Sequence, residues 1–353
     1  MDRIYIELLS KTEESLKRSN RWNFRFKSKD IAIGIYNALS GIPSTRKFDF
    51  FFWTTASLSL ALEYGYLKTQ NPEIIDVQIK YYNQWIKVNT NFYLLDQIMN
   101  GYPLISLNDN RRSKELENLI HNMYKYIDKY PRTSSGSLPY RINKPEVVLV
   151  DYLGMICPFL SRYGSTFNCE KASSLAGSLI QDFLRNGMDV KTSLPYHGFR
   201  SDNGERLGII GWGRGVGWLL IGMVDTLAFL DRSSETFWDI INNFKTIIDS
   251  IIPYQDEKGY FKWLIAADKG HIDTSATAMI GYSIKRAIDL DFLNIDYKPN
   301  AKIALEAIIN STREGQIFDS SAECQGIGEY PQRYEWNRWG QGFGTAFALT
   351  MVD

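Results

Sequence analysis

Helical periodicity along almost the whole chain is the feature that most limits how it can fold. Apolar residues recur every three or four positions, as they do along Leu116, Leu119, Ile120, Met123 and Ile127. Strand-like alternation is scarce, and Tyr260–Leu264 is its best short example. The pattern therefore predicts an all-α fold, with helices at Ile4–Arg18, Lys29–Leu39, Thr54–Leu67, Ile74–Val88, Leu94–Asn100, Ser113–Lys129, Val147–Arg162, Cys169–Asn186, Gly208–Leu230, Glu235–Ile252, Thr274–Ile288, Ala301–Ser311 and Gly342–Met351.

The connections between these helices predict a single domain with a site on one face. Four of them are longer than ordinary helix connectors, and long ordered loops tend to carry function. No low-complexity linker or block of charge divides the chain, which favours one domain over residues 1–353. Roughly one helix per 28 residues fits a closed ring of helix pairs with a funnel-shaped site. The long loops are Arg132–Asn143, Asn186–Asn203, Asp256–Gly270 and Thr312–Trp339.

Charge and composition exclude several classes of partner. Lys plus Arg and Asp plus Glu both number 40, so the net charge of zero argues against nucleic acid or an anionic membrane as the main partner. No uncharged apolar run approaches the ~20 residues that span a bilayer. The N-terminus lacks a signal-peptide pattern, so we expect a cytoplasmic protein. The few cysteines and histidines are scattered, which predicts free thiols and no metal site: Cys157, Cys169, Cys324, His121, His197 and His271.

The run Gly211–Trp218 is the densest group of residues suited to binding. It holds two indoles, one guanidinium and four glycines within eight positions. An indole offers a flat apolar face to a sugar ring, and Arg214 offers a planar fork to a carboxylate. The run predicts a pocket for a ring that carries an acid. The alternative is a glycine-rich helix start with Trp212 and Trp218 in the core and Arg214 at the surface.

Two acids and one histidine are candidates for chemistry. Asp151 interrupts the apolar run Val147–Met155, and a buried carboxyl of this kind often serves as a general acid. The alternative is an N-cap or a paired acid of the core. Asp96 follows two leucines in the same way, so the two acids can meet across a helical ring, and here the alternative is a helix N-cap. His197 lies in a long loop between Tyr196 and a glycine, where it is either a site residue or a surface histidine.

Taken in order, these motifs resemble the unsaturated glycuronyl hydrolases of glycoside hydrolase families 88 and 105, and more nearly the unsaturated rhamnogalacturonyl hydrolases of family 105. The resemblance covers about residues 50–353. Its specific parts are Val150–Met155 and Trp212–Trp218. The other landmarks are Trp53, Leu95–Gly101, Pro158–Leu160, Tyr196–Gly198, Thr274–Met279 and Gly342–Phe347.

The resemblance implies an (α/α)6 barrel and hydration of the C4=C5 double bond of an unsaturated uronic acid at a non-reducing end. It implies that Asp151 protonates C4 and helps water add at C5, and that Asp96 positions or tunes Asp151. It implies no metal or organic cofactor, a small oligosaccharide as substrate, and a monomer or weak homo-oligomer. The implied substrate contacts are Trp53, His197, Trp212, Arg214 and Trp218.

Two departures from the family pattern keep other functions open. Val216 stands where the family more often has Asn or Gln, and Asp273 stands where the helix opening often has Glu. Asp273 or Thr274 is also a natural N-cap. One alternative function is an ordinary glycosidase that uses Asp151 and Asp96 as an acid/base pair. The other is an inactive carbohydrate-binding relative.

Overall fold

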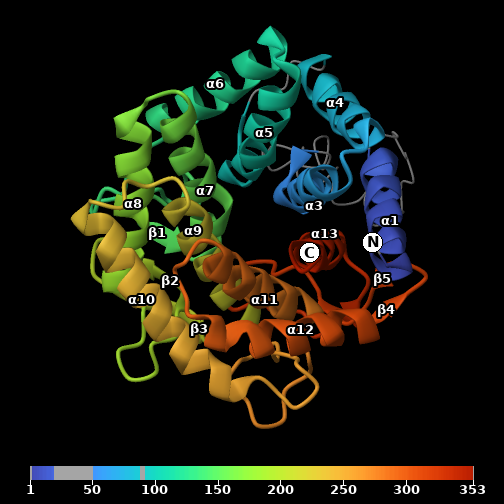
Figure 1. Ribbon diagram of the computed structural model, residues 1–353. Coiled ribbons are helices and arrows are strands. Elements are labelled where there is room, and N and C mark those ends of the chain that lie inside the picture. The colour runs from blue at the N-terminus through green and yellow to red at the C-terminus, as the bar shows by residue number, and fades with distance from the viewer. Residues whose placement is uncertain (1, 20–50, 88–91, 353) are drawn as a thin grey trace, which may run out of the picture.

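Twelve α-helices form two concentric layers in the computed structural model, which describes residues 2–19, 51–87 and 92–352 (Figure 1). The inner layer contains α3 (Trp53–Thr69), α5 (Gly101–Arg111), α7 (Asp151–Thr166), α9 (Gly213–Leu227), α11 (Thr274–Asp289) and α13 (Arg338–Thr350). The outer layer contains α1 (Arg3–Ser19), α4 (Pro72–Lys87), α6 (Lys114–Lys129), α8 (Glu170–Asn186), α10 (Glu235–Ile251) and α12 (Lys298–Asn310). Six inner and six outer helices within the described ranges make the predicted (α/α)6 barrel.

The apolar pattern decides which layer a helix joins. Every residue of α9 is buried, because this inner helix has neighbours on all sides. Helix α6 buries only one stripe, the leucines, isoleucines and methionine that reveal its periodicity in the sequence. Ser113 and Ser234 cap α6 and α10 by accepting hydrogen bonds from backbone N–H groups. The sequence therefore locates most helices to within a few residues.

Helix α5 is the described helix that the sequence prediction missed. Gly101 and Pro103 suggest a break after the predicted helix Leu94–Asn100, yet the chain continues from the 3-10 helix η2 (Leu95–Asn100) directly into α5. Proline is tolerated here because the N–H groups of a first turn have no partner within the helix. The predicted helix Lys29–Leu39 lies outside the described residues.

Short strands replace parts of the predicted helices beside the barrel mouth. Val147–Leu149 forms β1 and pairs antiparallel with β2 (Tyr196–Arg200), which pairs with β3 (Arg206–Ile210). The predicted strand Tyr260–Leu264 is wrong, since this segment makes only isolated bridges. Four two-residue strands complete the described strands: β4 (Thr312–Arg313), β5 (Gln316–Ile317), β6 (Ser320–Ser321) and β7 (Tyr334–Glu335).

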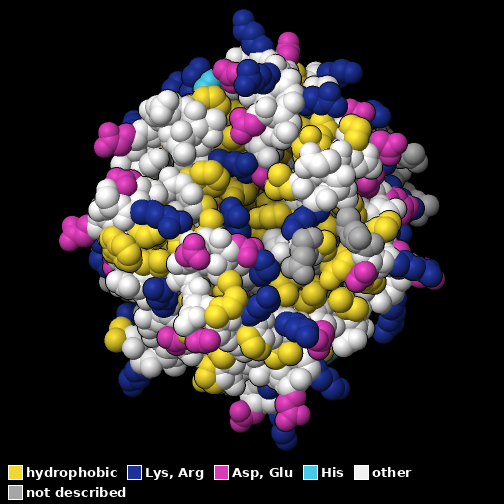
Figure 2. Space-filling view, viewed as in Figure 1, with side chains coloured by type: hydrophobic (Ala, Val, Ile, Leu, Met, Phe, Trp, Pro, Cys, Tyr) yellow, Lys and Arg dark blue, Asp and Glu magenta, His cyan; other side chains and the backbone are white. Residues whose placement is uncertain are grey.

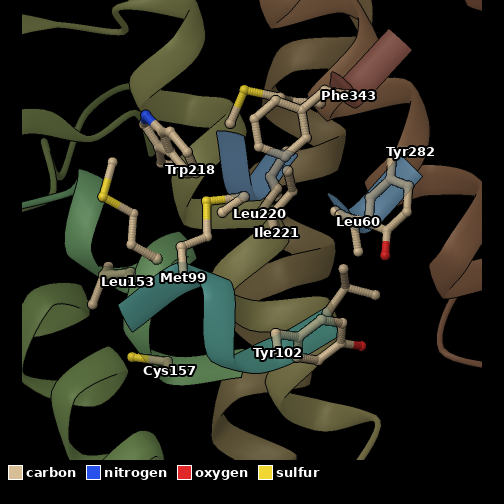
Figure 3. Packing of buried hydrophobic residues seen from close by; sticks show 14 of the residues in the cluster. Leu60, Met99, Tyr102, Leu153, Cys157, Trp218, Leu220, Ile221, Tyr282 and Phe343 are labelled. Carbon is tan, nitrogen blue, oxygen red and sulfur yellow. The ribbon is translucent and has the colours of Figure 1, made fainter. Parts of the chain in front are cut away.

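The barrel interior is one continuous cluster of buried apolar side chains (Figure 3). Helices α7 and α9 approach each other closely within it, because glycines stand at the contact. A Cβ at Gly154 would lie 2.5 Å from the Trp218 ring, and one at Gly222 would lie 2.6 Å from the carbonyl carbon of Leu153. The two backbones therefore pack at a distance that no larger residue permits.

Gly222→Ala is expected to lower the free energy of unfolding by about 1–3 kcal/mol, because the clash is with backbone that cannot rotate away. Urea denaturation measures the change. Gly270→Ala is the control, since its Cβ would meet nothing closer than 3.2 Å. A Gly222→Ala protein that unfolds at the wild-type urea concentration would contradict this account of the helix contact.

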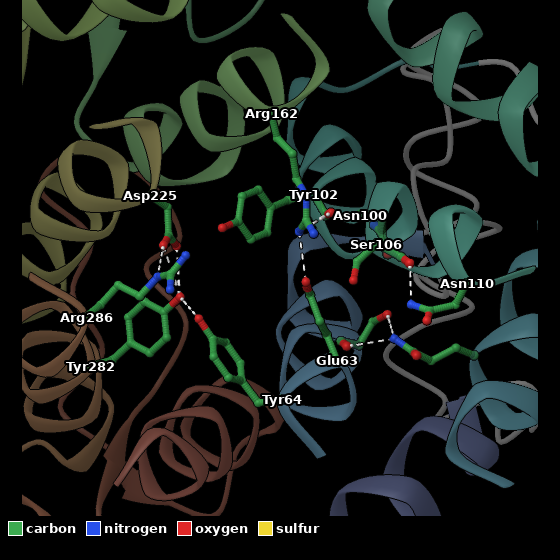
Figure 4. Close-up of polar contacts among 12 residues, drawn as sticks. Glu63, Tyr64, Asn100, Tyr102, Ser106, Asn110, Arg162, Asp225, Tyr282 and Arg286 are labelled. Atoms are coloured by element: carbon green, nitrogen blue, oxygen red, sulfur yellow. Dashed lines mark hydrogen bonds and ion pairs between the residues drawn. The ribbon is translucent and has the colours of Figure 1, made fainter. Parts of the chain in front are cut away.

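A buried polar network crosses the barrel near the carboxyl ends of the inner helices (Figure 4). Arg162 pairs with Glu63 at 2.8 Å, and Arg286 lies 3.4 Å from Asp225. The Tyr282 hydroxyl donates to Asp225. Burial raises the pKa of Asp225, and Arg286 acts against that shift. The network ties α3, α7, α9 and α11 together away from the helix N-termini.

The outer surface mixes charges of both signs. Figure 2 shows Lys and Arg interspersed with Asp and Glu, and hydrophobic side chains gathered around a hollow at the centre of that face. Among the described helices, none is both long and apolar enough to cross a membrane.

Candidate active site

The N-terminal ends of α3, α7 and α9 converge on one hollow of about 520 Å³. Six of the seven residues predicted for the site line it: Trp53, Asp96, Asp151, His197, Trp212 and Arg214. The remaining lining residues are Tyr140, Arg141, Leu149, Tyr152, Met155, Glu323, Cys324 and Gly326. The structure thus brings together residues that lie more than a hundred positions apart in the sequence.

Asp151 is the first residue of α7 and lies beside His197. Its side chain keeps 17% of its exposure, and its Oδ2 atom lies 3.2 Å from Nε2 of His197. That contact is close enough for an ion pair but not aligned as a hydrogen bond, so Oδ2 is buried without a hydrogen-bond partner in the described structure. Asp151 therefore presents one oxygen that is free of hydrogen bonds within the described structure and available for chemistry.

The small sheet explains how Asp151 and His197 meet. Leu149 of β1 pairs with Gly198 of β2, and the N–H of Val150 donates to the carbonyl of His197 at 2.9 Å. His197 is buried, with its ring 4.8 Å from the Trp212 ring. Its Nδ1 atom lies 2.7 Å from the hydroxyl of Tyr330. His197 is predicted in a loop, but it lies on a strand, where Nδ1 is hydrogen-bonded to Tyr330 and Nε2 faces Asp151.

Asp96 is not an N-cap but a member of an ion pair. Nη1 and Nη2 of Arg141 each lie 3.2 Å from one of its carboxylate oxygens, and Arg141 also donates to the hydroxyl of Tyr152. Burial acts to lower the pKa of the Arg141 guanidinium, but Asp96 and the neighbouring tyrosines raise it above its usual value. A two-pronged pair of this kind fixes both partners in orientation.

Arg214 uses its guanidinium to hold a loop. It is 2% exposed, and it donates to the carbonyl and hydroxyl of Ser321 and to the carbonyl of Ala322. Asp273 caps α11 and accepts from the same Ser321 hydroxyl at 2.6 Å. Asp273 faces Arg214 across the Ser321 hydroxyl, and no direct ion pair of Arg214 is found among the described residues. Arg214 therefore anchors the site loop and brings a guanidinium to the lining of the hollow.

The aromatic walls agree only in part with the prediction. Trp53 and Trp212 line the hollow, whereas Trp218 is fully buried between Trp53 and Phe343 and does not reach it (Figure 3). Trp218 lies more than one turn into α9, so its side chain turns into the barrel core. Val216 is likewise fully buried and is not among the lining residues. Val216, which replaces the family's more usual Asn or Gln, therefore contributes no side chain to the lining of this hollow.

Sequence reasoning missed several residues of the site. Arg141 lies in one predicted long loop, while Cys324 and Tyr330 lie in another. The length of these loops was the available signal, but it does not show which side chains turn inward.

A second hollow shares Glu323 with the first and is otherwise lined by Phe52, Thr54, Trp336, Asn337, Arg338 and Trp339. Within the described residues, no group of three His, Cys, Asp or Glu side chains has the arrangement of a metal site.

Cys324 is expected to react slowly and to inactivate the protein when it does. Burial and the nearby Asp151 raise the pKa of the Cys324 thiol to about 11. At pH 8 its thiolate fraction is about a hundredfold below that of an ordinary thiol, so iodoacetamide should label it about a hundredfold more slowly than glutathione. Mass spectrometry measures the rate. Cys324→Ser should abolish the associated loss of activity, and labelling at the rate of glutathione would contradict the raised pKa of the half-buried Cys324 thiol.

An aromatic hollow with an acid at its floor, at the mouth of an (α/α)6 barrel, defines the class: a carbohydrate-active hydrolase. The comparison with known families is consistent with that class. The chain belongs to Glycosyl Hydrolase Family 88, whose family model matches residues 10–353.

Individual relatives are more distant. The chain is similar to Protein Atu3128 of Agrobacterium fabrum, with 33% identity over 101 residues, which is 27% of this chain and 41% of that protein. The match therefore spans less than half the length of this curated relative. Among solved structures, a possible GH105 member from Klebsiella pneumoniae has a TM-score of 0.80 at 19% identity, covering 85% of this chain and 81% of its own. The unsaturated glucuronyl hydrolase of Bacillus sp. GL1 has a TM-score of 0.70 at 17% identity, covering 85% and 86%.

Proposed function

We propose that the protein hydrates the C4=C5 double bond of an unsaturated uronic acid at the non-reducing end of a lyase-generated oligosaccharide. The observation that carries the proposal is the position of Asp151. It is a carboxyl group on the floor of an aromatic hollow, with a buried oxygen that makes no aligned hydrogen bond. Solved structures of similar fold include an unsaturated glucuronyl hydrolase, which supports the same assignment.

The reaction requires one acid that later serves as a base. Protonated Asp151 gives its proton to C4, and positive charge develops at C5 and the ring oxygen. The resulting carboxylate takes a proton from a water molecule as the water oxygen bonds to C5. The product is a hemiketal, which opens and releases the remaining sugar. Asp151 ends the cycle protonated, so atoms and charge balance without a further group.

The surroundings suit an anionic sugar. The indoles of Trp53 and Trp212 present apolar faces to a pyranose ring. The uronate carboxylate is attracted by Arg214, whose guanidinium lines the hollow and makes no direct ion pair with a described acid. Arg141 contributes little net charge because Asp96 neutralises it. The second hollow, with Trp336 and Trp339, adjoins the first through Glu323 and is where we place the leaving sugar.

The Asp96–Arg141 pair disfavours an ordinary two-carboxylate glycosidase. In that mechanism the second carboxylate attacks C1 or activates water there. Both oxygens of Asp96 accept hydrogen bonds from Arg141 instead. Either role at C1 would require breaking this charge-assisted pair, so Asp96 is better suited to holding Arg141 and Tyr152 in place.

Loss of alkene absorbance in the ultraviolet tests the proposal. We expect the purified protein to bleach unsaturated disaccharides, with the preferred class identified from a panel of rhamnogalacturonan and glycosaminoglycan lyase products. Saturated disaccharides with the same linkages serve as the matched control and should stay intact. Cleavage of the saturated sugars, or no turnover across the panel, would overturn the proposal.

A further inference from the structure

Tyr330 stands at the outer end of a short chain of contacts that leads to Asp151. It lies between β6 and β7, and its hydroxyl is 2.7 Å from Nδ1 of His197. The other ring nitrogen of His197 lies 3.2 Å from Oδ2 of Asp151. Because a neutral imidazole carries one proton, the group that occupies Nδ1 decides what Nε2 offers to the acid.

The acid on the other side of the ring indicates which way the Tyr330 hydrogen bond runs. Burial raises the pKa of Tyr330 to about 12, so the phenol keeps its proton at neutral pH and can donate it to Nδ1. A carboxylate oxygen can only accept, so the ring nitrogen that faces Asp151 is the one suited to carry the imidazole proton. Nδ1 then accepts, and the imidazole proton belongs on Nε2.

Gly208 makes room for this contact. It adopts φ +78°, and a Cβ there would lie 2.7 Å from both the Cβ of His197 and the Tyr330 hydroxyl. Tyr330 is also held by its ring, which packs against His197, Trp212 and Trp263 with centroids 5.5–5.8 Å apart. Strand β3 and the β6–β7 loop thus fit together around the histidine.

We propose that Tyr330 is a positioning residue that fixes His197 as the tautomer with its proton on Nε2, facing Asp151. This role rests on the proposed function. A proton on Nε2, 3.2 Å from Oδ2, offsets the negative charge that Asp151 gains when it protonates C4. The titratable groups in contact with His197 are Asp151 and Tyr330. The other titratable and charged side chains of the described structure that line the same hollow are Asp96, Tyr140, Arg141, Tyr152, Arg214, Glu323 and Cys324.

Tyr330→Phe removes only the hydroxyl. We expect kcat on an unsaturated disaccharide to fall about ten- to a hundredfold with little change in KM. Tyr334→Phe is the matched control. Tyr334 lies on the same side of the barrel and stacks on His271, but its hydroxyl bonds Gln332.

Nitrogen-15 NMR of the imidazoles tests the tautomer without any substrate. The chain has only three histidines, so the His197 signals are assigned by comparison with His197→Gln. Wild type and Tyr334→Phe should show a pyrrole-type Nε2, and Tyr330→Phe should show a mixture of tautomers. Wild type with its proton on Nδ1, or Tyr330→Phe with unchanged spectra and unchanged kcat, would overturn the inference. If wild type turns over no unsaturated sugar, the proposed function fails while the NMR result still decides the tautomer.

Discussion

Asp151→Asn is expected to lower kcat by about a thousandfold or more while leaving the fold intact. General acid–base catalysis contributes about 10²–10⁴ to a rate, and here one side chain supplies both the proton for C4 and the base for water. An amide has nearly the shape of the carboxyl group, so the hollow and its contact with His197 are kept. The amide has no acidic proton to give. Rates from alkene absorbance, with circular dichroism as the check on folding, measure the effect.

The accompanying measurements separate chemistry from binding. KM, or a dissociation constant from calorimetry, should stay within a few-fold of wild type, because the aromatic walls and Arg214 are untouched. Asp76→Asn is the control, since Asp76 pairs with Arg111 on the outer surface of the barrel and is 59% exposed. It should retain full activity. An Asp151→Asn enzyme with more than a tenth of the wild-type kcat would show that another group donates the proton.

The helical pattern was enough to predict the barrel because helix layering depends on which faces are apolar. An apolar stripe such as that of α6 predicts directly which face of the helix is buried. The sequence was less informative where chain segments far apart meet. Val147–Leu149 has the apolar character of a helix, and only pairing with Tyr196–Arg200 makes it a strand. Long-range pairing of this kind leaves no local signal.

The site residues also differ in whether the local sequence reveals them. Asp151, Asp96 and His197 were found because an acid among apolar residues, or a histidine in a glycine-bounded loop, is unusual in its own neighbourhood. Arg141 and Tyr330 look ordinary in sequence, and their roles come from partners 45 and 133 residues away. The sequence of Trp212–Trp218 predicts that all of its large side chains line one binding pocket. Helical geometry instead turns Trp218 into the core and Arg214 toward Ser321.

Arg214→Met is the second large effect, because it removes three charge-assisted hydrogen bonds and leaves the Ala322 carbonyl without a donor, whereas the Ser321 carbonyl keeps its bond from Trp339. A buried partner left unsatisfied costs about 1–3 kcal/mol, so the free energy of unfolding should fall by about 1–3 kcal/mol. The loop that carries Glu323, Cys324 and Tyr330 loses its anchor at Ser321 and Ala322. The positive charge behind the hollow is lost too, so kcat/KM should fall at least about a hundredfold. Urea denaturation and steady-state kinetics measure the two effects.

The combination of both losses distinguishes a loop anchor from a direct substrate contact. Arg232→Met is the control, because Arg232 also donates to a carbonyl and lies over a phenyl ring, but at an exposed position outside the hollow. Its loss should change stability by less than about 1 kcal/mol. If Arg214→Met kept the wild-type stability and raised KM alone, the guanidinium would be binding the substrate carboxylate directly. A loss of stability together with a fall in kcat would instead show that Arg214 acts by holding the loop on which the Tyr330–His197–Asp151 chain depends.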